Sequence, residues 1–479
     1  MSDSVFRNYI GGEWVEGATT APDINPSNLS DIIGQCAMAS EAQMQCAIQA
    51  AADAFPKWRD TSPLLRFEAL DRIGSELLAR VGELGDLMAR EEGKTLAEAK
   101  AEVHRAGHLF KYFASEAYRA NGEGYQSLRD GVTLRVEREP IGVVGVISPW
   151  NFPLVIPAWK IAPALAYGNT VVFKPAELVP GSAWALAEII SRAGLAEGVF
   201  NLVMGQGAEV GAALVNNRLV DGITFTGSTP VGRRIGGQLF ERSARMQLEM
   251  GGKNPLVVLD DADLPLAVHC AINGSFFSTG QRCTASSRLI VTDGIHDTFV
   301  EAMRDAMCSL RIGDARAADT QIGPVSSAQQ LAVDEAYIQT GKNEGAVLAI
   351  GGERLKRANE GYYLSPALFI DANPAMAICR EEIFGPIAAI LRVRDYDEAL
   401  DVANDCDFGL SAGIVTGDRK RIDHFWRNMQ AGMIQVNLPT AGMDFHAPFT
   451  GRKGSSYGPP EKGSYCREFF TAPKVVHAL

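Results

Sequence analysis

The sequence predicts an α/β protein whose parallel sheets are covered by helices on both faces and divided between two domains. The first observation is the length, because 479 residues normally fold as two or three domains. The second is the alternation of short β-branched apolar runs with helical segments from about residue 141, which is typical of a parallel sheet. The third is another series of strands and helices after residue 253, which predicts the second domain.

The first long element is an amphipathic helix, and a helical pattern continues from it to about residue 119. Apolar residues recur at steps of three and four, so that one face turns towards a core. They are Leu64, Phe67, Leu70, Ile73, Leu77, Val81 and Leu84.

The strands of both sheets follow in order along the chain. Those of the first sheet are "GVVGVIS", "TVVFKP", "VFNLVMG" and "GITFTGS", with "SAWALAEIISRAG" as a covering helix. Those of the second are "NPLVVL", "SRLIVTD" and "AAILRV", with a helix near residues 295–311.

Residues 140–159 are uncharged and long enough to span a bilayer. Four prolines at 140, 149, 153 and 157 would break a membrane helix repeatedly. We therefore expect a buried strand followed by a loop here.

Composition and charge exclude several classes of protein. The chain is 46% hydrophobic and 21% charged, as expected of a soluble globular protein. Its net charge of −12, without a basic stripe, argues against a nucleic-acid or anionic-membrane partner. The N-terminus lacks the features of a signal peptide, which predicts a cytoplasmic protein. The eight cysteines form no C-x-x-C pair. We therefore expect all of them to be free thiols, and we expect no metal site.

Two patterns resemble ligand-binding motifs but are better explained by a structural role. "GQGAEVG" resembles a dinucleotide fingerprint, but its glycine spacing is one residue too long, which favours a plain strand-to-helix turn. His104 and His108 lie one helical turn apart, yet they lack the glutamate and the third ligand of a zinc site.

Three stretches carry a much more specific signal, and four others accompany them. The three are "PWNFP" (149–153), "LEMGGKNP" (248–255) and "FSTGQRCTASSR" (277–288). The others are "FKPAE" (173–177), "FTGST" (225–229), "EEIFGP" (381–386) and "PFTGRKGSS" (448–456). In order and spacing they resemble the aldehyde dehydrogenase superfamily over nearly the whole chain. The resemblance implies a Rossmann-like NAD-binding domain (1–122 and 141–250), an α/β catalytic domain (251–445) and a small β oligomerisation arm (123–140 and 459–479).

The chemistry of aldehyde oxidation needs the residue types that these motifs contain. Hydride leaves readily from a tetrahedral carbon that bears an anionic oxygen, and a thiolate can create that centre by addition. The resemblance makes Cys283 the nucleophile. It makes Asn151, with the backbone N–H of Cys283, the donor to the oxyanion. It makes Glu249 the general base that hydrolyses the resulting thioester. Read without the resemblance, these would be a buried thiol, a turn residue and a surface carboxylate.

Further residues match the cofactor site of the family. Lys174 and Glu177 match the residues that bind the adenosine ribose, and a carboxylate there favours NAD, with NADP as the weaker alternative. Gly227 and Ser228 match the helix start that approaches the pyrophosphate. Glu382 and Phe384 match the residues that hold the nicotinamide ribose and ring, and Trp150 is assigned to the same site.

Three residues are assigned to the substrate tunnel, namely Phe152, Trp159 and Arg282. Arg282 departs from the commoner cysteine, valine or threonine before the nucleophile, and position 450 is threonine where many members have glycine. We expect Arg282 to recognise a substrate carboxylate. Two alternatives are that it pairs with a structural carboxylate, or that it helps to keep Cys283 as thiolate.

The resemblance thus predicts a cytoplasmic NAD-dependent aldehyde dehydrogenase that forms a homodimer or homotetramer. Its C-terminal tail is most similar to that of enzymes acting on α-ketoglutaric semialdehyde, with succinic semialdehyde as the close second. The alternatives are another aliphatic aldehyde, a CoA-acylating enzyme, and a binding protein that kept the fold without turnover. The joint presence of Asn151, Glu249 and Cys283 argues against the last.

Overall fold

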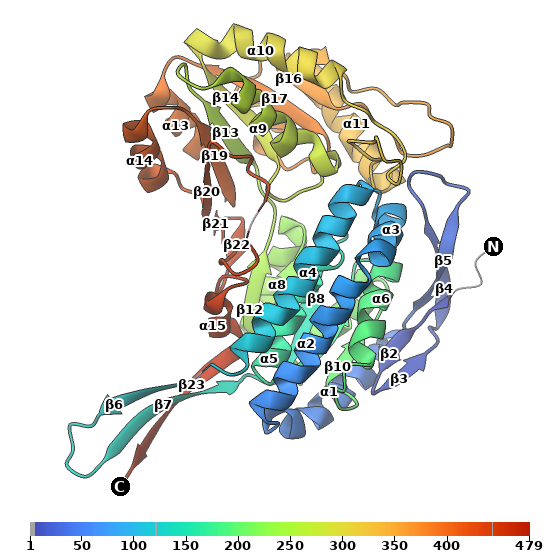
Figure 1. Ribbon diagram of the computed structural model, residues 1–479, viewed down its shortest axis with the longest axis vertical. Coiled ribbons are helices and arrows are strands. Elements are labelled where there is room, and N and C mark those ends of the chain that lie inside the picture. The colour runs from blue at the N-terminus through green and yellow to red at the C-terminus, as the bar shows by residue number, and fades with distance from the viewer. Residues whose placement is uncertain (1–4, 120–121, 443) are drawn as a thin grey trace.

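A computed structural model describes residues 5–119, 122–442 and 444–479 of the protein (Figure 1). Two sheets with covering helices form the two large parts of the molecule, and a narrow three-stranded sheet projects from the lower one. The predicted α/β class and the division between two sheets are therefore confirmed.

The first sheet has eight strands, of which the central five are parallel. In spatial order they are β22 (Ser456–Tyr457), β12 (Arg245–Glu249), β11 (Gly222–Thr226), β8 (Val143–Ile147), β9 (Thr170–Lys174), β10 (Phe200–Leu202), β2 (Asn8–Ile10) and β3 (Glu13–Val15). Side chains alternate between its faces, so that Val144 and Val143 belong to different cores.

Eight helices cover the two faces of this sheet. One core includes α2 (Pro63–Ala79), α3 (Val81–Glu92), α4 (Leu96–Glu116), α5 (Val155–Ala166) and α6 (Pro180–Ser191). The opposite core includes α1 (Glu41–Arg59), α7 (Ala212–Asn216) and α8 (Thr229–Glu241). A single turn of π-helix, η1 (Gly207–Gly211), precedes α7, so "GQGAEVG" is a strand-to-helix turn as expected.

The second sheet has seven strands, all parallel except β15 at one edge. In spatial order they are β15 (Val347–Ile350), β16 (Ala367–Ile370), β17 (Ile387–Val393), β14 (Ser286–Thr292), β13 (Asn254–Val258), β19 (Ser411–Val415) and β20 (Met433–Val436). One face packs on α9 (Leu264–Phe276) and α10 (Asp293–Cys308). The other packs on α11 (Ala328–Asn343), α12 (Ala377–Arg380), α13 (Tyr396–Asn404) and α14 (Arg419–Asn428).

Three small sheets complete the fold of the described residues. The projecting sheet contains β6 (Gly122–Gln126), β7 (Thr133–Pro140) and β23 (Thr471–Ala478), all antiparallel (Figure 1). The others are β1 (Val5–Phe6), β5 (Ile32–Met38) and β4 (Thr19–Ile24), and the pair β18 (Phe408–Gly409) and β21 (Arg452–Lys453). Before β23, the turns η3 (Ser464–Cys466) and α15 (Arg467–Phe470) bury Phe469 and Phe470 in the first core. Of the predicted arm residues 459–479, only β23 belongs to the projecting sheet.

Three local expectations are corrected. The apolar stripe from Leu64 to Leu84 runs over two helices, because the chain changes direction at Arg80 between α2 and α3. The "REFF" of the expected C-terminal strand forms α15. Residues 155–159 are not loop but the start of α5, since Pro157 lies in the first turn, where its missing N–H costs no helical hydrogen bond.

The sequence motifs meet at the carboxyl edge of the first sheet. Asn151 follows β8, Lys174 ends β9, Gly227 follows β11 and Glu249 ends β12. Because these strands are parallel, their carboxyl ends share one edge, which in open α/β sheets is the ligand-binding edge.

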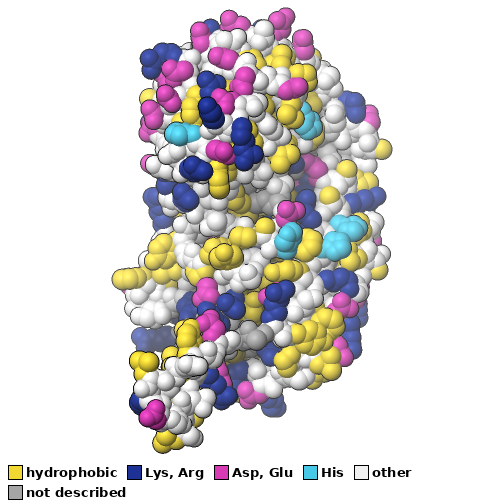
Figure 2. All heavy atoms as spheres, turned by 60° about the vertical axis from the view of Figure 1, so that its left-hand side comes forward, with side chains coloured by type: hydrophobic (Ala, Val, Ile, Leu, Met, Phe, Trp, Pro, Cys, Tyr) yellow, Lys and Arg dark blue, Asp and Glu magenta, His cyan; other side chains and the backbone are white. Residues whose placement is uncertain are grey.

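No helix in the described ranges is both long and apolar enough to cross a membrane. Figure 2 shows basic and acidic side chains mixed over the face that it presents. All eight cysteines are thiols.

Candidate active site

The predicted nucleophile lies in a tightly wound loop between η2 (Phe277–Gly280) and β14. Ser278, Thr279 and Gly280 all have left-handed backbone torsions, with φ of 51°, 57° and 66°. A Cβ on Gly280 would come within 2.2 Å of the carbonyl oxygen of Gly385, so only glycine fits there. Such a run of unfavourable torsions persists only where the surroundings hold it, as at active sites.

Cys283 faces a cavity of about 330 Å³ between the two large parts of the molecule. Its side chain also packs against Leu410, Met433 and Phe449. Phe152, Trp159 and Arg282 line the same cavity, so the structure brings the three predicted substrate residues together with Cys283. Their roles stay predictions.

The Cys283 thiol is not activated by its resting surroundings. Burial raises its pKa to about 12, and the carboxylates of Glu382 and Glu249 act in the same direction. The raised pKa favours the thiol over the thiolate, so the proton has to leave before Cys283 can attack.

Asn151 is held against the nucleophile loop. It is buried, and its Nδ2 donates to the carbonyl oxygen of Gln281 at 2.9 Å. An amide nitrogen carries two hydrogens, so the second can donate to an oxyanion at Cys283. The structure thus brings these residues together, while the oxyanion role stays a prediction.

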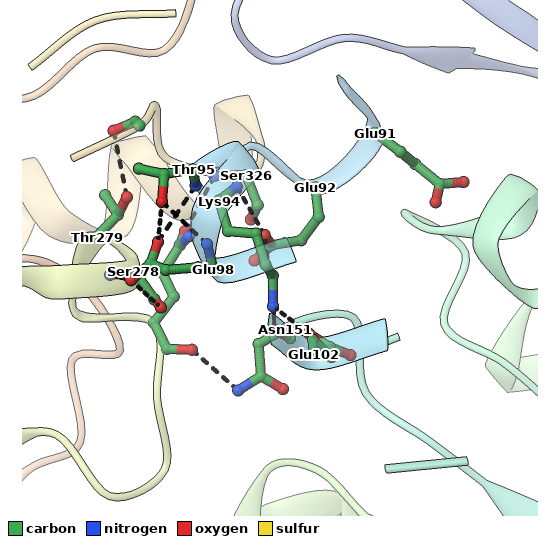
Figure 3. A network of polar contacts seen from close by, with 12 residues as sticks. Glu91, Glu92, Lys94, Thr95, Glu98, Glu102, Asn151, Ser278, Thr279 and Ser326 are labelled. Atoms are coloured by element: carbon green, nitrogen blue, oxygen red, sulfur yellow. Dashed lines mark hydrogen bonds and ion pairs between the residues drawn. The ribbon is translucent and has the colours of Figure 1, made fainter. Parts of the chain in front are cut away.

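A buried ion pair that the sequence analysis missed positions Asn151. Lys94 Nζ donates to the carbonyl oxygen of Asn151 at 2.5 Å and to Glu102 Oε2 at 2.6 Å. Glu102 Oε1 accepts from the backbone N–H groups of Leu154 and Val155 at the start of α5. Figure 3 shows Lys94 and Glu102 beside Asn151. The sequence shows Lys94 and Glu102 only eight residues apart, which suggests that they could pair. It gives no indication that Lys94 contacts Asn151, which lies 57 positions further along the chain.

Glu249 is buried at the end of β12, opposite Ser456 of β22. Ser456 Oγ donates to Glu249 Oε2 at 2.5 Å. Burial raises the pKa of Glu249 well above its ordinary value, the nearby Glu461 raises it further, and the Ser456 hydrogen bond opposes them. A carboxylate with a raised pKa is better matched to proton transfer near neutral pH.

A second buried ion pair, also missed, lies next to Glu249. Lys160 and Glu461 are 0% and 1% exposed and form an ion pair, and Lys160 Nζ also donates to Thr224 Oγ1 at 2.9 Å. The charge of Lys160 lowers the pKa of Glu249 while that of Glu461 raises it. These groups therefore tune the predicted base, although 301 residues separate Lys160 from Glu461.

Arg282 lines the cavity, and its guanidinium is already engaged. Its Nη2 lies 2.9 Å from Glu98 Oε1, its Nε donates to Ser278 Oγ at 3.0 Å, and its Nη1 donates to the carbonyl oxygen of Asn273 at 3.2 Å. Glu98 Oε1 also accepts from the N–H and hydroxyl of Ser278, as Figure 3 shows. The ion pair with Glu98 agrees with the alternative in which Arg282 pairs with a structural carboxylate. Recognition of a substrate carboxylate by Arg282 stays a prediction.

The predicted ribose-binding residues contact each other. Lys174 Nζ lies 3.1 Å from Glu177 Oε1, which also accepts from the backbone N–H of Gly207 at 2.6 Å. The Glu177 side chain is 47% exposed, so it is accessible to a ligand at the edge of the sheet.

The other cofactor residues fit a dinucleotide. Ser228 is the N-cap of α8 but makes no side-chain cap, which leaves the positive helix end open to a phosphate. The buried hydroxyl oxygens of Ser148 and Thr226, after β8 and at the end of β11, have no hydrogen-bond partner among the described residues. They would gain partners from a bound ligand.

Of the residues predicted to hold the nicotinamide, Glu382 accepts through Oε1 from the N–H of Gly252 at 2.8 Å, and burial raises the pKa of Glu382 to about 7. Trp150 and Phe384 pack edge to face with their ring centroids 5.4 Å apart. Glu382 and Phe384 line one small pocket together with Gly252 and Arg282. The cofactor contacts of the predicted residues stay predictions.

Comparison with known proteins decides the family. The model of the aldehyde dehydrogenase family matches residues 14–476. The chain belongs to the aldehyde dehydrogenase family. It is 42% identical to the α-ketoglutaric semialdehyde dehydrogenase of Bacillus subtilis, over 99% of this chain and 98% of that one. It is 39% identical to the 2,5-dioxopentanoate dehydrogenase of Saccharolobus solfataricus, over 98% and 99%. Among solved structures, betaine aldehyde dehydrogenase of Staphylococcus aureus in complex with NAD+ superposes with a TM-score of 0.96 at 33% identity, covering 98% and 94%.

Membership of the aldehyde dehydrogenase family confirms the resemblance, the fold and the enzyme class. The chain is an oxidoreductase that acts on aldehydes.

Proposed function

We propose that this aldehyde dehydrogenase oxidises a short ω-oxo acid, such as α-ketoglutaric semialdehyde (2,5-dioxopentanoate), to the dicarboxylate with NAD. The observation that carries the proposal is the cavity in which Cys283 lies beside three cationic side chains, those of Arg105, Arg282 and Lys462. The names of the relatives from Bacillus subtilis and Saccharolobus solfataricus support it, as does NAD+ in the solved relative.

The residues then act in two stages. The Cys283 thiol first loses its proton to solvent water, and the thiolate then adds to the aldehyde carbon. The Asn151 amide with the Cys283 backbone N–H stabilises the oxyanion of the thiohemiacetal. When bound, NAD supplies the acceptor for the hydride that leaves this carbon. Glu249 next removes a proton from water, which adds to the thioester carbon. The bond between the carbon and the sulfur of Cys283 then breaks. This releases the carboxylic acid and leaves Cys283 as a thiolate.

The direct test is an NADH absorbance assay with a panel of aldehydes, with and without an ω-carboxylate. We expect NADH formation with NAD, and a higher kcat/KM for the ω-carboxylated members, succinic semialdehyde included. Absence of NADH with every aldehyde would overturn the proposal. Addition of CoA is expected to change neither rate nor product, because Glu249 provides for hydrolysis; an acyl-CoA product would favour the acylating alternative.

Glu177→Ser should raise the use of NADP relative to NAD. The carboxylate that binds a ribose 2′-hydroxyl repels a 2′-phosphate, and its removal leaves Lys174 without that counter-charge. We expect the ratio of kcat/KM for NADP to that for NAD to rise roughly 10-fold or more, the scale of one charge-assisted hydrogen bond. Glu241→Ser, at the far end of α8, is the matched control. An unchanged ratio in Glu177→Ser would mean that another residue selects the cofactor.

The projecting sheet of β6, β7 and β23 is proposed to pair with a second copy of the chain. All five residues of β6 are exposed, and Tyr125 and Val475 are 54% and 58% exposed. Exposed sheet edges are ready to pair with another strand. The sequence analysis predicts a dimer or tetramer in the cytoplasm. A molecular mass in solution equal to that of one chain would contradict the oligomer.

A further inference from the structure

The charged side chains that line the Cys283 cavity do not balance. They are Glu98, Arg105, Arg282 and Lys462, one carboxylate against three cations. Glu98 is paired with Arg282. Two cations, Arg105 and Lys462, are therefore left over in a cavity that is otherwise mainly apolar, within a chain whose net charge is −12.

Lys462 is fixed in the cavity wall by the backbone that precedes it. Only 2% of it is exposed, and its φ of 58° is one that non-glycine residues rarely adopt. The preceding residue, Glu461, is held by two backbone hydrogen bonds with Phe449, at 2.7 and 2.9 Å. This bridge keeps Lys462 in place, because it fixes the point from which its side chain enters the cavity.

The Lys462 ammonium has few partners. Its Nζ lies 3.3 Å from the carbonyl oxygen of Asp444, and 5.3 and 5.5 Å from the ring centroids of Trp159 and Phe449. In the part of the chain that the structure describes, no carboxylate lies within ion-pair distance of this Nζ. Burial lowers the pKa of Lys462 to about 8; Arg105 acts in the same direction and Glu461 against it.

Arg105 approaches the same cavity from α4. It lies seven residues after Glu98, hence on the same face of that helix. Across the described ranges, no carboxylate lies within ion-pair distance of its guanidinium, and its charge acts on both Arg282 and Lys462. An anion between Arg105 and Lys462 would relieve the repulsion between two partly desolvated cations, whereas a neutral aldehyde would not.

We infer that Arg105 and Lys462 together bind the carboxylate of the aldehyde substrate, while Arg282 holds the nucleophile loop through Glu98. This inference rests on the proposed function, of which it names the specificity residues. Arg282, whose charge Glu98 compensates, supports the loop. Arg105 and Lys462 recognise the anion.

The test compares succinic semialdehyde with butanal, which has the same number of carbons and no charge. Lys462→Gln and Arg105→Met are each expected to lower kcat/KM for succinic semialdehyde roughly 10- to 150-fold, mostly through KM, and to change butanal oxidation by less than about threefold. Arg282→Leu should lower kcat/KM for both aldehydes by the same factor. Lys100→Met, an exposed cation on α4 away from the cavity, is the control.

A second measurement uses a ligand that does not react. Glutarate, an unreactive dicarboxylate, should inhibit the wild-type enzyme competitively, and this inhibition should weaken at least 10-fold in Lys462→Gln and Arg105→Met. Equal losses for both aldehydes in these variants, or a selective loss only in Arg282→Leu, would overturn the inference. So would wild-type enzyme that oxidises butanal as well as succinic semialdehyde, and that result would leave aldehyde oxidation itself intact. It would also remove the ω-oxo acid as the proposed substrate class, and absence of NADH with every aldehyde would remove aldehyde oxidation as well.

Discussion

Cys283→Ala is expected to abolish NADH formation with every aldehyde while NAD binding stays nearly unchanged. The variant cannot form the thiohemiacetal from which hydride leaves, and the residues proposed to hold NAD are separate from the thiol. Steady-state NADH absorbance measures the loss, and calorimetric titration with NAD measures the binding.

Cys308→Ala is the matched control, because Cys308 is an exposed thiol on α10 outside the cavity. It should keep wild-type activity. Substantial turnover by Cys283→Ala would contradict the covalent mechanism, and loss of NAD binding in that variant would mean that the substitution disturbs the loop more widely.

Glu249→Gln should separate the two stages of the reaction. If Glu249 activates water, its amide slows thioester hydrolysis roughly 100- to 10,000-fold, the usual contribution of a general base. Hydride transfer precedes that step, so rapid mixing should show a burst of about one NADH per active site before a slow steady rate. Mass spectrometry should find the acylated chain during this steady state.

The pH dependence follows from the raised pKa of Glu249. A general base works only when it has lost its proton, so thioester hydrolysis in the wild type should rise with pH through that pKa, and Glu249→Gln should lose the rise. Ser456→Ala removes the hydrogen bond that lowers this pKa, and should move the rise to higher pH. Full steady-state activity of Glu249→Gln, with no burst, would exclude Glu249 as the base.

The fold was predictable where the residue pattern of a single segment is enough to identify the element. The β-branched runs that became β8, β9, β10 and β11 are buried on both faces, so they read as continuous apolar strands. The break at Arg80 was not predictable from periodicity, since the apolar spacing continues through it from α2 into α3. The short strands β2 and β3, at one end of the first sheet, have too few residues for a periodic signal.

The sequence by itself determined the family and predicted the residues of the reaction, because each of Asn151, Glu249 and Cys283 lies within a short specific motif. Tertiary structure decided what surrounds them. Lys94 reaches Asn151 across 57 positions, and Glu98 reaches Arg282 across 184. Such pairs depend on which elements the fold brings to one edge of a sheet, and burial then makes their charges strong enough to shift a pKa or hold a loop. Whether a cation in the cavity is compensated is therefore a property of the folded chain alone.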